Sequence, residues 1–186
     1  MSNMASHLNI GTNQDDASFR YKMPVLALDT HQKKSTIITN LGDVAKALGV
    51  DPIWLVKYFT YHFGVPVTYA KGHATFKGSR SASDLSMCLG EFIQQFVVCP
   101  KCNLPEIDWC AKPRYDQIEI DCRACGHNTM LSSQKNKKIF DKMVGYICTE
   151  AEKGTKKAVK KVKEEAAEAT EEPHYGIDDG KWSDEM

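Results

Sequence analysis

Four cysteines in two matched pairs constrain the fold of this chain more than any other feature. Cys99-Pro-Lys-Cys102 and Cys122-Arg-Ala-Cys125 form a C-x2-C-x19-C-x2-C pattern. A C-x2-C turn directs two sulfurs toward one point, and two such turns facing each other give a closed tetrahedral set of four thiolates. Zinc suits this set, and four protein ligands leave no position for water. The pattern therefore predicts a structural zinc ion held by Cys99, Cys102, Cys122 and Cys125.

Other interpretations of the cysteines stay open. The two pairs can be unrelated reduced thiols, or one pair can have a thioredoxin-like redox role, although redox chemistry needs only one pair. His127 follows the second pair and is a competing ligand, although the set of four thiolates is already complete. Cys110 and Cys148 are expected to be free thiols. A disulfide framework is not expected, because the cysteine number is odd, at 7, and the polar N-terminus lacks a secretory signal.

Composition and periodicity divide the 186 residues into four segments. Residues 1–18 are small and polar, and we expect a disordered arm. Residues 19–97 are expected to form a mixed α/β domain, and residues 98–149 a zinc ribbon with a short closing helix. Residues 150–186 are rich in alanine, lysine and glutamate and predict a charged linker with an acidic, tryptophan-containing tail. The expected fold class is α/β, of the α+β kind, followed by the four-cysteine ribbon.

Turn residues and alternation predict the strands. Strands are expected at residues 25–28 and 35–39, with a polar loop over 29–34 between them. Residues 65–69 and 74–76 predict a hairpin. A further ribbon strand and a short helical pattern are expected at 116–120 and 135–149.

Helical spacing predicts three helices before the ribbon. The first two span 41–48 and 52–63 and are bounded by capping residues, namely Asn40, Gly49, Asp51 and Gly64. The third is defined by an apolar stripe, and Cys88 on it is expected to be a buried small hydrophobic side chain. The stripe consists of Leu85, Cys88, Leu89, Phe92, Ile93 and Phe96.

The sequence lacks the motifs of several enzyme classes. It contains no G-x4-G-K-[ST] phosphate loop, no G-x-S-x-G elbow and no H-E-x-x-H pair. We therefore expect no active site of its own. No apolar run approaches the length of a membrane-spanning helix, so we expect a cytoplasmic protein without a membrane partner.

Arg20 is one of four arginines, and it stands among aromatic residues in Phe19-Arg-Tyr-Lys-Met-Pro24. It is either an ordinary surface charge or an arginine that inserts into the phosphate site of a partner. The second interpretation rests on the planar, permanently charged guanidinium group, which suits developing negative charge on phosphate.

Several ordered motifs together resemble a known family. They are Phe19-Arg-Tyr-Lys-Met-Pro24, Thr39-Asn-Leu-Gly-Asp-Val-Ala-Lys-Ala-Leu48, Lys57-Tyr-Phe59 and the Cys-Pro-Lys-Cys…Cys-Arg-Ala-Cys-Gly ribbon. Over residues 19–145 these motifs resemble the N-terminal domain of eukaryotic translation initiation factor 5, which is homologous to the C-terminal part of the initiation factor 2 beta subunit. The resemblance implies a mixed α/β domain followed by a zinc ribbon.

The resemblance also implies an activity, which is to stimulate GTP hydrolysis by initiation factor 2 during start-codon recognition. The implied partners are the gamma and beta subunits of that factor, with GTP and initiator tRNA, and the small ribosomal subunit. Arg20 takes the place of the family's proposed arginine finger. Lys57 matches one family lysine, whereas Ser35 occupies the place of another, with Lys34 adjacent to it. The acidic tail around Trp182 resembles the family's acidic linker and implies contact with other initiation factors.

Two alternatives to GTPase activation remain open. The chain can be a non-catalytic GTPase-binding subunit like the beta subunit, although residues 1–18 lack the lysine blocks of that subunit. It can also be a nucleic-acid-binding module that uses the ribbon or a helix-turn-helix at 40–63. The helix over Trp54–Tyr61 is too apolar and aromatic to read the edges of DNA bases. Factor 5 continues into a C-terminal all-helical domain, and this sequence ends before it.

Overall fold

The computed structural model describes residues 7–11, 16, 18–31, 35–133 and 136–168. The chain divides into two compact units, Met1–Ala151 and Glu152–Met186, and each is described by itself. The strands of the described residues form three sheets. The elements in chain order are β1 (His7–Asn9), β2 (Lys22–Pro24), β3 (Leu28–His31), β4 (Ser35–Ile38), α1 (Leu41–Leu48), α2 (Pro52–Phe63), β5 (Val67–Ala70), β6 (His73–Lys77), α3 (Ala82–Phe96), β7 (Ile107–Lys112), the 3-10 helix η1 (Pro113–Tyr115), β8 (Gln117–Cys122), β9 (Asn128–Met130) and α4 (Lys137–Glu168).

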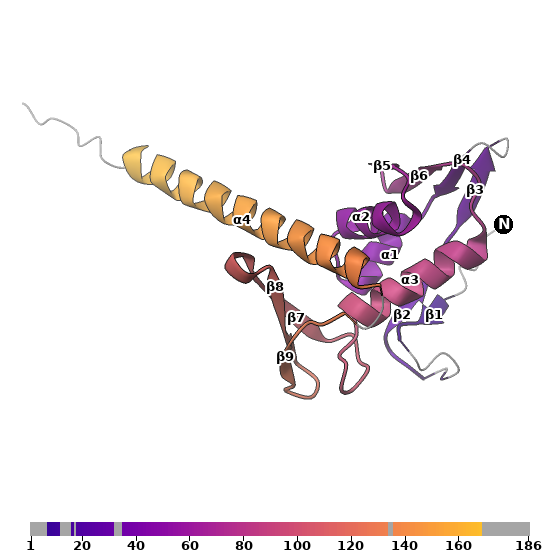
Figure 1. Ribbon diagram of the computed structural model, residues 1–186, viewed down its shortest axis with the longest axis horizontal. Helices are drawn as coiled ribbons and strands as arrows, with labels where there is room; N and C mark the ends of the chain where they lie inside the picture. The colour runs from indigo at the N-terminus through magenta and orange to yellow at the C-terminus, as the bar shows by residue number, and fades with distance from the viewer. Residues whose placement is uncertain (1–6, 12–15, 17, 32–34, 134–135, 169–186) are drawn as a thin grey trace, which may run out of the picture. The chain divides into compact units, whose positions relative to one another are not determined.

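The four-stranded sheet has the antiparallel order β3-β4-β6-β5, and α1 and α2 pack against it (Figure 1). Residues alternate along β4 and β6, so that Ile38, Ala74 and Phe76 are buried. The ring of Phe76 meets that of Phe59 on α2 at 5.6 Å between centroids. The hairpin predicted from residues 65–69 and 74–76 is confirmed by the pairing of β5 with β6, which are joined by Lys71 and Gly72. This sheet and its two helices form the mixed α/β domain.

The first strand of this sheet differs from the prediction. It begins at Leu28 rather than Val25 and includes part of the expected loop. The reason lies in Asn40, whose side chain donates to the carbonyl of Val25 at 2.7 Å and accepts from the amide of Ala27 at 2.8 Å. These two bonds hold residues 25–27 in place of a strand partner. Asn40 therefore occupies the N-cap position of α1 without capping it through its side chain.

The other helix boundaries follow the predicted capping residues. Asp51 accepts a hydrogen bond from the amide of Ile53 at 2.8 Å, and Pro52 starts α2. Gly49 and Gly64 end α1 and α2 with φ angles of 69° and 65°. Glycine adopts this left-handed conformation without the steric cost that a Cβ imposes.

Helix α3 buries the apolar stripe that the sequence predicted. Its Phe92 ring lies 5.2 Å from Tyr58 of α2, and its Phe96 ring stacks 5.6 Å from Phe140 of α4. Cys88 is completely buried, as expected. Burial, together with the nearby charge of Glu91, raises the pKa of Cys88 far above its usual value of 9.0. The thiol therefore acts as a core group.

The ribbon is an antiparallel sheet in the order β7-β8-β9. Strand β8 runs from Gln117 to Cys122, whereas the sequence predicted 116–120. The start shifts because Asp116 has a φ of 47° and closes the turn after η1. The end shifts because Ile107 of β7 pairs with Cys122, so the ladder runs up to the second cysteine pair.

Helix α4 is longer than the short closing helix that was expected. It runs from Lys137 to Glu168, across the boundary that the sequence placed at 149 and 150. Its first part packs into the core through Phe140, Met143, Val144, Ile147 and Cys148, and the first compact unit ends at Ala151. Among the described residues no helix is long and apolar enough to cross a membrane. Trp182 and the acidic tail lie outside the described residues.

The arm that was expected to be disordered contains a strand. β1 at His7–Asn9 pairs with β2, and the amide of Ile10 donates to the carbonyl of Tyr21 at 2.9 Å. Ile10 is buried in the core and anchors this segment. Its apolar signal is only two or three residues long, which is too short for sequence periodicity to detect.

Candidate metal centre and arginine site

The first cysteine pair forms a tight turn between α3 and β7. The amide of Cys99 donates to the carbonyl of Leu104 at 3.0 Å, and the amide of Asn103 donates to the carbonyl of Cys99 at 2.9 Å. Asn103 has a φ of 55°, which asparagine tolerates better than most residues. The amide of Lys101 points at the Cys99 sulfur at 3.4 Å. The turn thus presents both sulfur atoms and an N–H group to one point.

The second pair repeats this turn bond for bond. The amide of Cys122 donates to the carbonyl of His127 at 3.0 Å, and the amide of Gly126 donates to the carbonyl of Cys122 at 2.8 Å. Gly126 has a φ of 65° and takes the place of Asn103. Two turns of the same geometry therefore bring their sulfur atoms together beside the ribbon's first hairpin.

The four sulfur atoms form one cluster, within 4.8 Å of one another. The Cys99 and Cys125 sulfurs are 3.8 Å apart, and those of Cys102 and Cys122 are 3.6 Å apart. A zinc–sulfur bond of about 2.3 Å in a tetrahedron places neighbouring sulfurs about 3.8 Å apart, whereas a disulfide bond needs about 2.0 Å. The cluster therefore fits a tetrahedral metal ion held by four thiolates, and it does not fit disulfides.

The charge of the site also fits a cation. Burial raises the pKa of the Cys99 thiol, but the amides of Cys102 and Lys101 outweigh it, so that the pKa falls to about 7. Burial and the neighbouring sulfurs raise the pKa of Cys102 to about 12. Four thiolates cannot all form at neutral pH beside one another unless a cation balances them, and a divalent ion supplies that charge.

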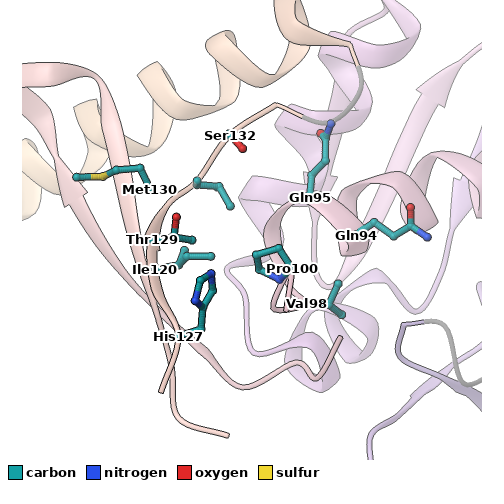
Figure 2. A pocket seen from close by; sticks show the side chains of 10 residues that line it. Gln94, Gln95, Val98, Pro100, Ile120, His127, Thr129, Met130 and Ser132 are labelled. Atoms are coloured by element: carbon teal, nitrogen blue, oxygen red, sulfur yellow. The ribbon is translucent and has the colours of Figure 1, made fainter. Parts of the chain in front are cut away.

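The remaining sulfur and nitrogen candidates lie apart from this cluster. His127 contributes its backbone to the second turn, and Figure 2 shows its ring among side chains that line a cavity of about 240 Å³ at the end of α3. The group of possible metal ligands among the described residues contains the four cysteines without His127. Cys110 is exposed on β7, and buried Cys148 donates its S–H to the carbonyl of Gln117 at 3.6 Å.

Arg20 lies just before β2 and reaches the ribbon. Its Nη2 atom donates to Oε1 of Glu106 at 2.5 Å and also contacts the hydroxyl of Tyr21. The guanidinium carbon lies 4.7 Å from the centre of the Tyr21 ring, a cation–π contact. The side chain is nevertheless 75% exposed. The guanidinium group is therefore bonded through one nitrogen, while most of the side chain is exposed to solvent.

Sequence reasoning did not identify Glu106. The residue lies 86 positions from Arg20, and no spacing rule connects the two. Its backbone carbonyl accepts from the amide of Arg123 at 2.9 Å, inside the second cysteine turn. The carboxylate that holds Arg20 is thus attached to the backbone of the metal centre.

Lys57, the predicted lysine that the structure describes, contacts α4 rather than Arg20. The ammonium group of Lys57 lies 5.3 Å from the centre of the Tyr146 ring on α4. A second contact runs in the opposite direction, from Lys142 of α4 to Tyr61 of α2 at 5.8 Å. Lys57 therefore belongs to the packing between α2 and α4, whereas Arg20 contacts the ribbon. Lys34 lies outside the described residues.

Comparison with known proteins matches residues 11–128 to the family model for the domain found in initiation factors 2B and 5. The chain is similar to eukaryotic translation initiation factor 5 of Mus musculus, at 35% identity over 131 residues, which cover 68% of this chain and 30% of the relative. It is also similar to probable eukaryotic translation initiation factor 5 of Schizosaccharomyces pombe, at 31% identity over 132 residues, with 68% and 33% covered.

A third relative extends the similarity to plants. The probable eukaryotic translation initiation factor 5-2 of Arabidopsis thaliana is 34% identical over 124 residues, which cover 63% of this chain and 28% of that protein. The matched region thus spans about a third of the length of these curated relatives. The span of the family match contains the four cysteines, Arg20, Lys57 and Glu106.

Proposed function

The chain belongs to the family that shares the domain found in initiation factors 2B and 5, and from this premise we propose that it is a translation initiation factor that activates a GTPase. The proposed target is initiation factor 2 carrying GTP and initiator tRNA on the small ribosomal subunit, with contacts to its gamma and beta subunits. The chain acts on the active site of its partner in the cytoplasm and supplies no active site of its own. Its similarity to relatives named initiation factor 5 supports this proposal.

The observation that carries the proposal is the placement of Arg20. Its side chain is 75% exposed, and one nitrogen of its guanidinium group is bonded to Glu106 of the ribbon. An arginine that enters a GTPase site in trans neutralises charge that develops on the phosphates in the transition state. In other GTPases such an arginine accelerates hydrolysis by about 10³–10⁵-fold. Arg20 is a suitable candidate because its side chain is accessible to a partner and its guanidinium group is positively charged at any physiological pH.

We infer that the metal is zinc and that its role is structural. Cys99, Cys102, Cys122 and Cys125 would hold it, and the four thiolates leave no coordination position for water or substrate. Bound zinc supplies the folding energy that fixes the two cysteine turns. These turns in turn fix the backbone of Glu106, which contacts Arg20.

The lysines have at most a supporting part in this proposal. Lys57 can act through charge toward phosphate or RNA only if its ammonium group leaves the Tyr146 ring. Lys34 remains a candidate from sequence alone, as does the acidic Trp182 tail as a contact to other initiation factors. Both need tests by substitution in the full chain.

A second candidate function is a GTPase-binding subunit that does not accelerate hydrolysis. The family description leaves it open, because the matched domain is not confined to initiation factor 5. In that case Arg20 is a surface contact and the chain binds its partner in a nucleotide-independent manner. A zinc-ribbon RNA-binding module is a weaker alternative, because helix α2 packs against α3, β5 and α4 and is not presented as a recognition helix.

The proposal is tested by single-turnover GTP hydrolysis. Initiation factor 2 is loaded with GTP and initiator tRNA on the small subunit, and the full chain is added at saturating concentration. We expect strong stimulation by the wild type, its loss in Arg20→Lys, and full retention in Arg114→Lys, which makes the same change at an exposed site of the ribbon. Absence of stimulation by folded wild type favours the binding subunit. Equal stimulation by Arg20→Lys and Arg114→Lys would show that stimulation does not depend on the Arg20 guanidinium group.

A further inference from the structure

We propose that Glu106 is a positioning residue that orients the guanidinium group of Arg20 for insertion into the partner's phosphate site. This inference rests on the proposed function, because it assigns a second residue to the same site. It concerns a side chain that no sequence motif identifies. Two observations support it, namely the geometry at Arg20 and the burial and backbone bonding of Glu106. The small contribution expected of the ion pair to stability separates this role from a structural one.

The contacts at Arg20 use one edge of its guanidinium group. Both hydrogen bonds, to Glu106 and to the Tyr21 hydroxyl, come from the single nitrogen Nη2. The guanidinium carbon lies over the Tyr21 ring, 4.7 Å from its centre. The edge formed by Nε and Nη1 contributes to neither bond, and this edge offers N–H groups of the kind that bind phosphate oxygens. The arrangement thus fixes the group and keeps donors for another anion.

Glu106 is the more buried member of the pair, and its backbone is bonded to the second cysteine turn. Its side chain is 21% exposed, compared with 75% for Arg20. Its carbonyl is bonded to the amide of Arg123 between Cys122 and Cys125, and the next residue, Ile107, pairs with Cys122 in the ribbon ladder. The carboxylate is therefore held by the backbone of the cysteine turns, whereas Arg20 lies in the connection between β1 and β2.

A positioning role follows from this asymmetry. A long arginine side chain in solvent samples many rotamers, and each productive encounter with a partner must first select one of them. The Glu106 carboxylate and the Tyr21 ring lower the number of rotamers that Arg20 samples, because only a few rotamers satisfy both contacts. This restriction of the rotamers increases the stimulated rate, since a larger fraction of encounters with the partner reaches the productive geometry.

The ion pair contributes little to folding. One partner is mostly exposed, and exposed ion pairs are screened by water and salt. Removal of the Glu106 carboxylate should therefore leave the fold, the metal content and the bound complex intact. This separates the proposed role from a structural one.

The test compares Glu106→Ala and Glu106→Gln in the full chain, with Asp121→Ala as the matched control, because Asp121 is an exposed acid on the same ribbon. Single-turnover hydrolysis by GTP-loaded initiation factor 2 is measured as a function of the concentration of each variant. We expect Glu106→Ala to lower the maximal stimulated rate about fivefold, while the half-saturating concentration changes by less than about twofold. Glu106→Gln, which keeps a hydrogen-bond acceptor, should recover part of the loss. Asp121→Ala, the zinc content and the melting temperature should all match the wild type.

Double substitution separates this inference from the proposed function. In the Arg20→Lys background, Glu106→Ala should have no further effect on the rate, since Glu106 acts only through the guanidinium group that this background lacks. If Arg20→Lys abolishes stimulation but Glu106→Ala does not lower it, the inference is wrong and the function stands. An increased rate in Glu106→Ala also overturns it, because the carboxylate would then be a latch that restrains the arginine.

A readout without GTP covers the case in which no stimulation occurs. The ¹⁵N and ¹H signals of the Arg20 guanidinium group report rotation about its Cζ–Nε bond. We expect slow rotation in the wild-type chain and in Asp121→Ala, and fast rotation in Glu106→Ala. Fast rotation in the wild type means that Glu106 does not orient Arg20, whatever the activity of the chain.

Discussion

Trp54 of α2 and Trp109 of β7 contact each other with 4.8 Å between their ring centroids and 38° between their planes. This pair joins the mixed α/β domain to the ribbon. Trp109→Ala should lower the free energy of unfolding by about 2 kcal/mol, because it removes half-buried aromatic surface and a ring–ring contact. Urea unfolding followed by circular dichroism measures the change.

A double-mutant cycle with Trp54→Ala should give a coupling of about 1 kcal/mol between the two rings. Tyr115→Ala serves as the control, because Tyr115 is a large aromatic side chain of the ribbon that is 72% exposed. We expect it to change stability by less than about 0.5 kcal/mol. Additive effects of the two tryptophan substitutions would show that the rings do not hold the ribbon to α2.

The features predicted from sequence are those encoded by neighbouring residues. The cap at Asp51, the glycine stops and the buried stripe around Phe92 depend on spacings of one helical turn, and the structure contains them. The cysteine cluster was predictable because each C-x2-C turn is a local geometry that both pairs repeat. Such features depend little on the rest of the fold.

The features that sequence reasoning missed depend on residues that are far apart in the chain. Arg20 meets Glu106, and Lys57 meets Tyr146, only after the domain, the ribbon and α4 have packed together. Asn40 was predicted as a cap, yet its amide group is used by residues 25–27, because the fold brings that backbone within reach. Long-range contacts of this kind override local preference.

The buried polar groups of the core predict a dependence of stability on alkaline pH. Burial, with Glu91 nearby, raises the pKa of Cys88 above its usual 9.0, and burial likewise raises the pKa of Tyr58 above 10.0. As pH rises, the unfolded chain loses these protons before the folded protein does, so the folded state binds more protons. Stability is therefore unaffected by these two groups below about pH 8 and falls above about pH 9.

Urea unfolding at several pH values between about 8 and 10.5 measures this decline. Cys88→Ala should be less stable at neutral pH, because it leaves a small cavity, but its stability should fall less steeply with pH. Cys110→Ala removes an exposed thiol and should keep the slope of the wild type. Equal slopes in all three proteins would contradict a contribution from Cys88.

Substitution of Lys57 distinguishes a role in packing between α2 and α4 from a role of its charge toward the partner. Its contact with Tyr146 is a partly exposed cation–π pair, so Lys57→Ala should lower the free energy of unfolding by about 0.5–1 kcal/mol. Lys57→Arg keeps a cation over the ring and should restore stability. Thermal unfolding of both variants, beside Tyr146→Leu, checks this. If Lys57→Ala loses GTPase stimulation while its stability is unchanged, the lysine acts on the partner and not on α4.

Metal removal tests the ribbon and its connection to Arg20 together. We expect one zinc ion per chain in metal analysis, its loss in Cys122→Ser, and its retention in Cys110→Ser, which alters an exposed thiol outside the cluster. Loss of zinc should cost more than about 3 kcal/mol of stability, because the cysteine turns have little apolar core to replace it.

Loss of zinc should also change the position of the Arg20 side chain, through the backbone of the second cysteine turn. Without metal the second turn relaxes, the bond from the Arg123 amide to the Glu106 carbonyl is lost, and the carboxylate no longer holds the guanidinium group. Hydrogen exchange should therefore increase at the Arg123 amide and along β7 and β8, while the amides of α3 before the first cysteine remain protected. Unchanged exchange at Arg123 in zinc-free protein would show that the turns keep their geometry without metal, and the positioning of Arg20 would then be independent of the zinc site.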